Sequence, residues 1–183
     1  MNMDDLLTFL YDHIDDWPST TEEAASHDML AETHQKEIRG IDAYKQRFPD
    51  STYAWPEEQN GKGDLIVDDA RAQFKTARVV ESKSGLQLNL STSAGTDLNH
   101  NKLVAPYPHD AFDILIVVWE DDAGTSHFWR IPADELTKKG YLSTSEQAGI
   151  ISMTVYGPEG VGPQPDPSAN TPANTWTRKF YLA

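Results

Sequence analysis

An acid, an amide and a lysine lie close together in the chain as Asp64, Gln73 and Lys75. Gln73 and Lys75 are two residues apart in an extended pattern, so both side chains are expected on one face of a β-strand. Two interpretations of these residue types are open. In the first, Lys75 pairs with Asp64 across neighbouring strands, which contributes about 0.2–1 kcal/mol. In the second, the same groups form a metal site.

A β-hairpin is predicted to position these groups. Residues 65–67 and 72–80 are extended patterns, and a polar, turn-like cluster separates them. With a two-residue loop at residues 69–70, Asp64 falls opposite Lys75 on the shared face. A slip of one residue in the strand pairing would move the side chains of one strand to the other face. The spacing of the site therefore depends on the turn.

A carboxylate also lies on the inner face of a predicted helix. Residues 21–48 are expected to be helical, and Glu37 lies on the apolar stripe of this helix. A charge that faces the interior requires a cation or a metal ion as its partner. Alternatively, Glu37 lies at the edge of the stripe and its carboxylate reaches water. The stripe consists of Leu30, Ile38, Ile41, Tyr44 and Phe48.

The remaining pattern predicts one α/β domain over residues 1–183, with a central mixed sheet flanked by helices. Residues 112–119 are the most apolar run, and they predict a strand that is buried on both faces at the centre of the sheet. Residues 91–102 are polar and are expected to be irregular. A loop rich in proline and glycine is predicted at residues 157–174, followed by a C-terminal strand or tail at residues 175–183.

Further helices are predicted from apolar spacing and capping signals over residues 3–17 and 132–139. Further strands are predicted from alternation of apolar and polar residues, over residues 51–56, 86–90, 127–131 and 150–156.

The hairpin motif resembles that of the PD-(D/E)xK nuclease superfamily, which has the restriction-endonuclease-like fold. Asp64 matches the conserved aspartate of the family, and Gln73-Phe74-Lys75 matches its acid-x-lysine tripeptide in the Q-x-K variant. Glu37 matches the acidic position that many members carry on the preceding helix.

The resemblance covers residues 25–140, because the order of the predicted elements over this range also matches the family. Gly63 stands where the family has the proline that gives the motif its name. That position serves backbone geometry, so the departure leaves the implied chemistry intact.

The resemblance implies a metal-dependent endodeoxyribonuclease of the restriction or homing type, which uses Mg²⁺ or Mn²⁺ to hydrolyse DNA. A hard divalent cation prefers oxygen ligands; it activates water and stabilises the charge on the phosphate. Lys75 would polarise the attacking water or neutralise the phosphate. A homo-oligomer is expected by analogy, because a duplex has two strands to cut. The implied metal ligands are Asp64, the Gln73 side-chain oxygen, the Phe74 carbonyl and Glu37, and the implied catalytic residues are Asp64, Gln73, Lys75 and Glu37.

The charge of the chain opposes a polyanionic partner. The formal net charge is −14, from 29 Asp and Glu against 15 Lys and Arg. An alternative function is therefore a non-catalytic acidic binding protein, either a degenerate nuclease fold or a nucleic-acid mimic. A nuclease would have to gather its cations locally. The candidates are Lys62, Arg71, Arg78, Lys83, Lys102, Arg130, Lys138, Lys139, Arg178 and Lys179.

Other features narrow the chemistry. The chain has no cysteine, which excludes disulfides, Cys-ligated zinc and a thiol nucleophile. Its acidic N-terminus and the lack of a long apolar run predict a cytoplasmic protein that does not enter a membrane. Tyr107, His109 and Asp113 precede or begin the buried strand, where they either border the site or have structural roles.

Overall fold

The computed structural model describes residues 36–56, 64–96 and 102–183. The chain divides into two compact units, residues 1–36 and 37–183, and the second unit is described here. The helix predicted over residues 3–17 and the start of the helix predicted over residues 21–48 lie outside the described residues. The single domain over residues 1–183 stays a prediction. No helix in the described part of the chain has the length and apolar character needed to cross a membrane.

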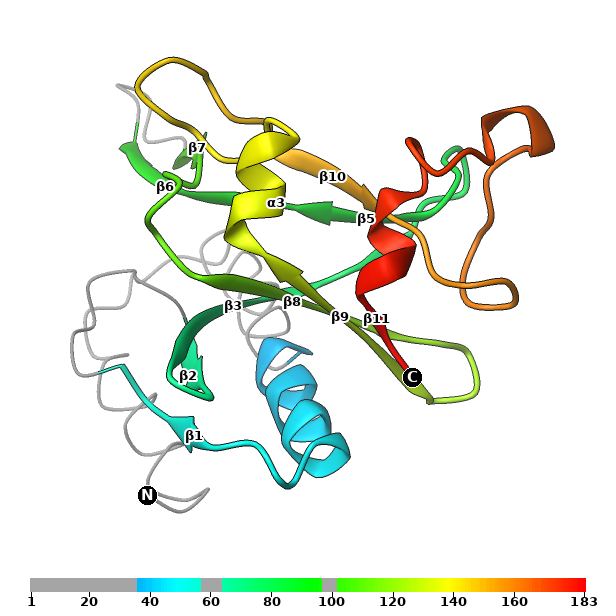
Figure 1. Cartoon of the computed structure of the whole chain (residues 1–183), viewed down its shortest axis with the longest axis horizontal. Helices are drawn as coiled ribbons and strands as arrows, with labels where there is room; N and C mark the ends of the chain where they lie inside the picture. Colours follow the sequence, from blue (N-terminus) through cyan, green and yellow to red (C-terminus); the bar gives the residue numbers. More distant parts are fainter. Residues whose placement is uncertain (1–35, 57–63, 97–101) are drawn as a thin grey trace, which may run out of the picture. The chain divides into compact units, whose positions relative to one another are not determined.

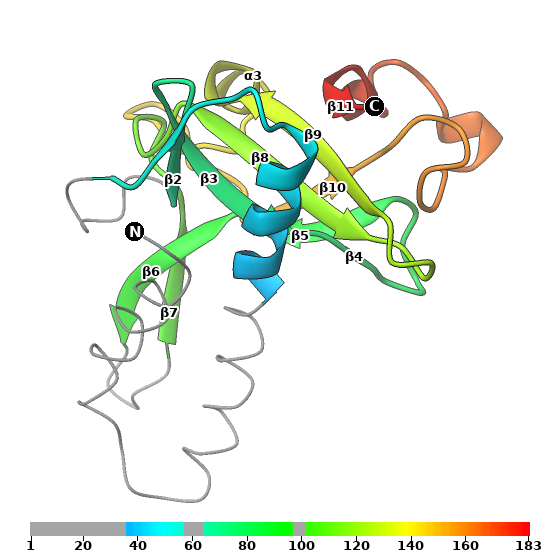
Figure 2. The same cartoon turned by 90° about the horizontal axis from the view of Figure 1, so that it is seen from below.

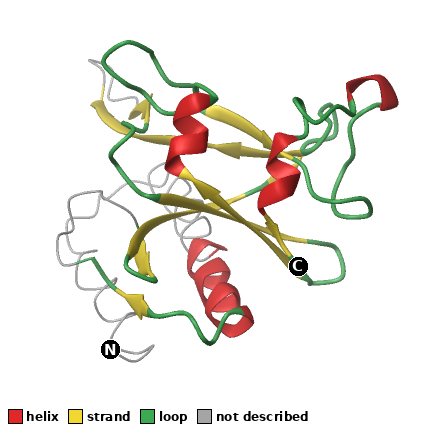
Figure 3. Cartoon of the chain, viewed as in Figure 1, coloured by secondary structure: helices red, strands yellow, loops and turns green. Residues whose placement is uncertain are grey.

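A six-stranded sheet organises this unit (Figures 1 and 3). Strands β3 and β8 are parallel, and the other neighbours in the sheet are antiparallel, so the sheet is mixed as predicted. The strands in spatial order are β1 (Tyr53–Ala54), β2 (Leu65–Val67), β3 (Ala70–Thr76), β8 (Ile114–Glu120), β9 (Ser126–Pro132) and β11 (Tyr181–Leu182).

Strand β8 lies inside the sheet between β3 and β9, and the residues from Ile114 to Val118 are all buried. An unbroken apolar run suits this position, because both faces of the strand are covered. The prediction of a doubly buried central strand is confirmed.

Helices cover both faces of the sheet (Figure 2). On one face, Ile41 and Tyr44 of the helix at residues 36–47 pack with Phe74. On the other face, Leu136 of helix α3 (Ala133–Lys138) packs among apolar side chains that include Trp129. The α/β fold with a central mixed sheet flanked by helices is thus confirmed.

Helix α3 lies within the predicted range 132–139 and is one residue shorter at each end. Pro132 is the N-cap residue in an extended conformation, and its fixed φ suits the entry to a helix. Gly140 has a φ of 79° just beyond the end of the helix, a conformation that glycine adopts without steric cost.

A second sheet of three strands and a two-stranded ribbon lie outside the six-stranded sheet. The second sheet has the order β10 (Ser152–Val155), β5 (Leu86–Asn89) and β4 (Arg78–Val79), and the ribbon pairs β6 (Ser91–Thr96) with β7 (Lys102–Pro106). The ribbon corrects the expectation of an irregular segment at residues 91–102 for residues 91–96 and 102, whereas residues 97–101 lie outside the described residues. The backbone pairing of these two strands does not require an apolar face, so the polar sequence gave no sign of the ribbon.

The C-terminal segment differs in part from the predicted strand. Residues 157–174 contain one short 3-10 helix, η1 (Pro167–Ala169). A second 3-10 helix, η2 (Trp176–Phe180), follows, and only Tyr181–Leu182 form a strand, β11, against β9. The alternation of apolar and polar residues from Trp176 onwards therefore belongs mainly to the docked 3-10 helix η2, and only its end is an extended strand.

Candidate functional site

The turn of the β2–β3 hairpin determines where the candidate residues lie. Asp68 and Asp69 form the loop, with φ values of 50° and 66°. A two-residue hairpin loop of type I′ requires positive φ at both positions, and aspartate tolerates this better than most residues. The observed pairs run from Val67 with Ala70 to Leu65 with Ala72. The loop predicted at residues 69–70 is therefore wrong by one position, and the strand pairing shifts by two residues.

Contacts of the Asp68 carboxylate help to hold this turn. Its oxygens accept hydrogen bonds from the Thr52 backbone N (2.9 Å) and the Ser51 hydroxyl (3.1 Å). Arg130 Nη1 lies 3.3 Å from Asp68 Oδ2. Hydrogen bonding, above all from Thr52, lowers the pKa of Asp68. These partners come from elsewhere in the fold, so a local turn pattern could not indicate them.

The shift by two residues keeps the predicted face but changes the neighbour of Asp64. Asp64 lies beside Gln73 instead of opposite Lys75, and its backbone N donates to Ala72 O (2.7 Å). Asp64 Oδ2 accepts one hydrogen bond from Phe74 N (2.8 Å) and another from Gln73 Nε2. The carboxylate is thereby fixed against the backbone of β3.

Burial sets the charge state of Asp64. Loss of water around the carboxyl raises its pKa, and the hydrogen bond from Phe74 N and the Lys75 charge oppose this only in part. Gln73, only 4% exposed, lies in the same buried environment. Asp64 is therefore a carboxyl group that a nearby cation would stabilise in its charged form.

Lys75 pairs with Glu37 instead of Asp64. Lys75 Nζ lies 3.3 Å from Glu37 Oε1, and the side chains are 18% and 24% exposed. Burial lowers the pKa of Lys75, but the charges of Glu37, Tyr107 and Asp64 together outweigh it, so the pKa is raised. Lys75 is therefore an ammonium ion at neutral pH. The structure thus brings Glu37, from the helix, to the same place as the hairpin residues.

Tyr107 also borders this group. Lys75 Nζ lies 5.8 Å from the centre of the Tyr107 ring, and Tyr107 is 7% exposed. The sequence is compatible with two roles for Tyr107, one at the edge of the site and one in the structure alone. The available sequence signal is its position between two prolines, because an X-Pro step holds the chain extended.

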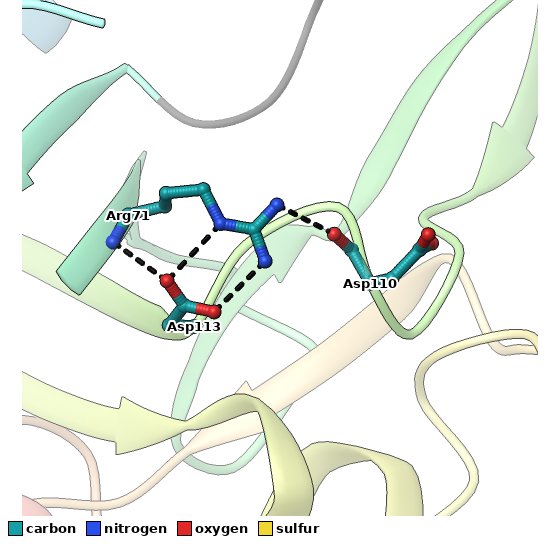
Figure 4. A network of polar contacts seen from close by, with 3 residues as sticks. All are labelled: Arg71, Asp110 and Asp113. Atoms are coloured by element: carbon teal, nitrogen blue, oxygen red, sulfur yellow. Dashed lines mark hydrogen bonds and ion pairs between the residues drawn. The ribbon is translucent and has the colours of Figure 1, made fainter.

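The two other candidates before the buried strand lie in different surroundings. Asp113 forms a bidentate pair with Arg71, at 2.8 Å from Nη2 and 3.1 Å from Nε, and Arg71 Nη1 donates to Asp110 O (Figure 4). This network ties β3 to the segment before β8. His109 is exposed, and its backbone N donates to Ser143 O.

A divalent cation would find oxygen donors at the hairpin. Gln73 Nε2 donates to Asp64 Oδ2 and lies 3.4 Å from Phe74 O, so its amide hydrogens face two of the expected ligand oxygens. Rotation of this amide would present its oxygen instead. The part of the chain that the structure describes has no cluster of three or more His, Cys, Asp or Glu placed to hold a metal. A cation bound at these few oxygens would keep several waters, as Mg²⁺ commonly does in proteins.

Several cations proposed for DNA contact are already engaged. Arg71 pairs with Asp113, and Arg130 pairs with Asp68. Lys138 and Lys179 both contact Glu135. Arg178 donates to Gly157 O, Asn170 and Gln164. Of the other candidates, Lys62 lies outside the described residues. The basic residues named from the sequence therefore serve internal contacts to a large extent.

Comparisons with known proteins identify the fold. No protein-family model matches the chain, and no curated protein matches it either. The bacterial homing endonuclease I-Ssp6803I is similar in structure, with a TM-score of 0.52 and 14% identity over 73% of this chain and 84% of that one. The crystal structure of MepB is also similar, with a TM-score of 0.51 and 22% identity over 76% of this chain and 92% of that one. At these identities the likeness concerns the fold alone, and the chain has a nuclease-like, restriction-endonuclease-like fold.

Proposed function

We propose that this protein is a metal-dependent endodeoxyribonuclease of the restriction or homing type, in the Q-x-K variant of the PD-(D/E)xK pattern. The observation that carries the proposal is the meeting of a buried carboxyl, a buried amide and an ammonium ion at one place in the fold. Asp64 and Gln73 supply the first two groups, and Lys75 supplies the third, 3.3 Å from Glu37. The similarity in fold to a homing endonuclease supports the same reaction class.

The proposed metal ligands are Asp64, the Gln73 side-chain oxygen, the Phe74 carbonyl and Glu37. Mg²⁺ bound there, or Mn²⁺ in its place, would activate water and stabilise the phosphate charge. The chain contributes the placement of these oxygens, because Phe74 N holds the Asp64 carboxylate and Lys75 holds Glu37. Metal binding requires the charged form of Asp64, and because the pKa of this buried carboxyl is raised, protons compete with the metal as the pH falls.

The raised pKa of Lys75 keeps this residue charged, because the nearby carboxylates, Glu37 above all, outweigh the effect of burial. A charged ammonium ion cannot act as a general base. It can polarise the attacking water or neutralise the phosphate, which are the two roles that the resemblance leaves open. A partly buried ammonium ion is effective in either role because little water screens it.

The test is a cleavage assay with purified protein on supercoiled plasmid, linear duplex and single-stranded RNA, with Mg²⁺, Mn²⁺ or EDTA. Cleavage of DNA that requires either metal is expected. Lys75→Ala should lower the rate at least about 100-fold, whereas Lys45→Ala, which removes a lysine that lies over the Tyr53 and Trp55 rings, should not. A protein that cleaves no nucleic acid under these conditions, or a Lys75→Ala variant with full activity, contradicts the proposal. The oligomeric state in the same buffers tests the proposed homo-oligomer.

The charge of the chain favours a second candidate function, a non-catalytic acidic protein. Such a protein would bind a basic partner at the DNA-binding surface of that partner. The net charge is −14, and several candidate cations are held in internal pairs. Such a protein needs no metal, so Asp64→Asn should leave its binding unchanged. Its affinity for a basic protein should fall as salt is added, because salt screens surface charges. Titration with Mg²⁺, followed by calorimetry, separates the two candidates. The nuclease should show heat of Mg²⁺ binding that Asp64→Asn abolishes, whereas the acidic binding protein needs no such binding.

A further inference from the structure

The side chain of Tyr107 is held in a fixed position beside the candidate site. Its backbone carbonyl accepts two hydrogen bonds from Ser143, one from the backbone N (2.9 Å) and one from the hydroxyl (3.2 Å). Its ring packs against Phe112 in an edge-to-face arrangement, with 5.4 Å between the ring centres. Tyr107 also lies between two prolines, Pro106 and Pro108. Backbone and ring are therefore both restrained, and the residue is buried.

Lys75 lies between this rigid ring and a carboxylate from another part of the fold. Its Nζ is 3.3 Å from Glu37 Oε1 and 5.8 Å from the centre of the Tyr107 ring. Burial raises the pKa of the Tyr107 hydroxyl, and the charge of Lys75 and a side-chain hydrogen bond with it oppose this rise. Lysine is a point charge on a flexible stem of four carbons, and a single ion pair leaves such a stem several rotamers. Two partners in different directions define the place of the charge.

We propose that Tyr107 is a positioning residue that holds the Lys75 ammonium beside Asp64 and Gln73. The catalytic consequence of this proposal rests on the proposed nuclease function, but the positioning itself does not. The hydroxyl holds the ammonium by a dipole, and the ring supplies a face that attracts cations. Without the hydroxyl, the ammonium gains freedom to turn towards Glu37 and away from the place where a phosphate would bind. A misplacement of about 1 Å at a reacting centre costs up to about 100-fold in rate.

The conservative variant Tyr107→Phe separates positioning from packing. It keeps the ring against Phe112 and the backbone contacts to Ser143, and it removes only the hydroxyl. Tyr156→Phe is the matched control, because it removes a tyrosine hydroxyl that contacts the Ser84 hydroxyl (3.0 Å) instead of Lys75. Both variants are expected to fold, so thermal unfolding of each checks that any effect is local.

The first measurement is the NMR order parameter of the Lys75 ammonium group in full-length, metal-free protein. It should fall in Tyr107→Phe and stay at the wild-type value in Tyr156→Phe. The second is a split of steady-state constants for DNA cleavage, in which kcat of Tyr107→Phe falls about 10-fold or more with KM unchanged. An unchanged order parameter in Tyr107→Phe overturns the positioning role. A wild-type protein without cleavage overturns the nuclease proposal instead, and the order parameter then still decides the role of Tyr107.

Discussion

Gln73 donates a hydrogen bond from its side-chain amide to Asp64 Oδ2, the same oxygen that accepts from Phe74 N. A neutral amide and a backbone N–H thus both donate to the buried acid. The amide satisfies the carboxyl without adding charge to a place that is short of water.

Asp64→Asn should stabilise the metal-free protein and abolish metal-dependent cleavage. The asparagine oxygen can accept the bonds from Phe74 and Gln73, and the cost of burying a charge disappears. We expect the free energy of unfolding at pH 7 to rise by about 1 kcal/mol, or about 2–4 °C in Tm. Thermal unfolding in EDTA measures this, and a loss of stability would show that the carboxylate is well solvated in the folded protein.

The stabilisation by Asp64→Asn should depend on pH with a defined sign. The pKa of Asp64 is raised in the folded protein, chiefly by burial, so folding favours the protonated form. The stability that this carboxyl contributes is complete below its unfolded pKa, about 3.9, and is lost as the pH rises through the folded pKa. The difference in unfolding free energy between Asp64→Asn and wild type should therefore be small at pH 4 and larger at pH 7. Urea unfolding at both values tests it.

Gln73→Glu should lower the stability of the metal-free protein and strengthen its binding of metal. A second carboxylate beside Asp64 lacks the donor that the amide provides, so the metal-free protein should lose about 1–3 kcal/mol of unfolding free energy at pH 7. An added anionic ligand should tighten Mg²⁺ binding about 10-fold or more. Melting curves in EDTA and in excess Mg²⁺ give both effects. Gln87→Glu, on β5 and half-buried, is the control, and its response to Mg²⁺ should match that of wild type.

Lys75→Met should destabilise the protein even where no reaction is measured. The change removes the ammonium ion that lies 3.3 Å from the partly buried Glu37 carboxylate, and Asp64 loses a nearby positive charge. We expect a loss of about 1–3 kcal/mol in unfolding free energy, below the value for a fully buried pair because some water reaches this one. Lys75→Arg retains the charge and should lose less than half as much. A Lys75→Met variant as stable as wild type would mean that the Lys75–Glu37 ion pair contributes nothing measurable to stability.

The Arg71–Asp113 pair should contribute to stability but not to the site. Hydrogen bonding to Arg71 lowers the pKa of Asp113, and the two side chains are 31% and 46% exposed. Solvent screening limits a pair of this kind to about 0.5–1 kcal/mol in a double-mutant cycle of Arg71→Met and Asp113→Asn. Because the pKa is lowered, this contribution is present above the unfolded pKa of about 3.9 and is lost as the pH falls through the folded value. Unfolding at pH 7 and pH 2.5 measures the coupling, and Mg²⁺ binding should be unchanged in all three variants.

The sequence by itself determined the elements whose signal is local. Five apolar residues in a row, from Ile114 to Val118, predict a strand covered on both faces, and these residues are buried. The helical spacing of Glu37, Ile41 and Tyr44 puts the acid on the apolar stripe or at its edge. The sequence also predicts which polar residues of the hairpin share a face, because alternation along a strand puts Gln73 and Lys75 on the same side.

Only the tertiary structure decided which of these groups are partners. Asp68 and Asp69 have positive φ values, in a turn that Thr52 and Arg130 contact. The strand pairing that goes with this turn places Asp64 beside Gln73. Lys75 then pairs with Glu37. The pairing of β6 with β7 was hidden for a related reason, since backbone hydrogen bonds connect polar residues as readily as apolar ones. The Asp64–Gln73 pairing and the β6–β7 ribbon depend on strand register, and the Lys75–Glu37 pair joins groups 38 residues apart, so the alternation of polar and apolar residues does not predict them.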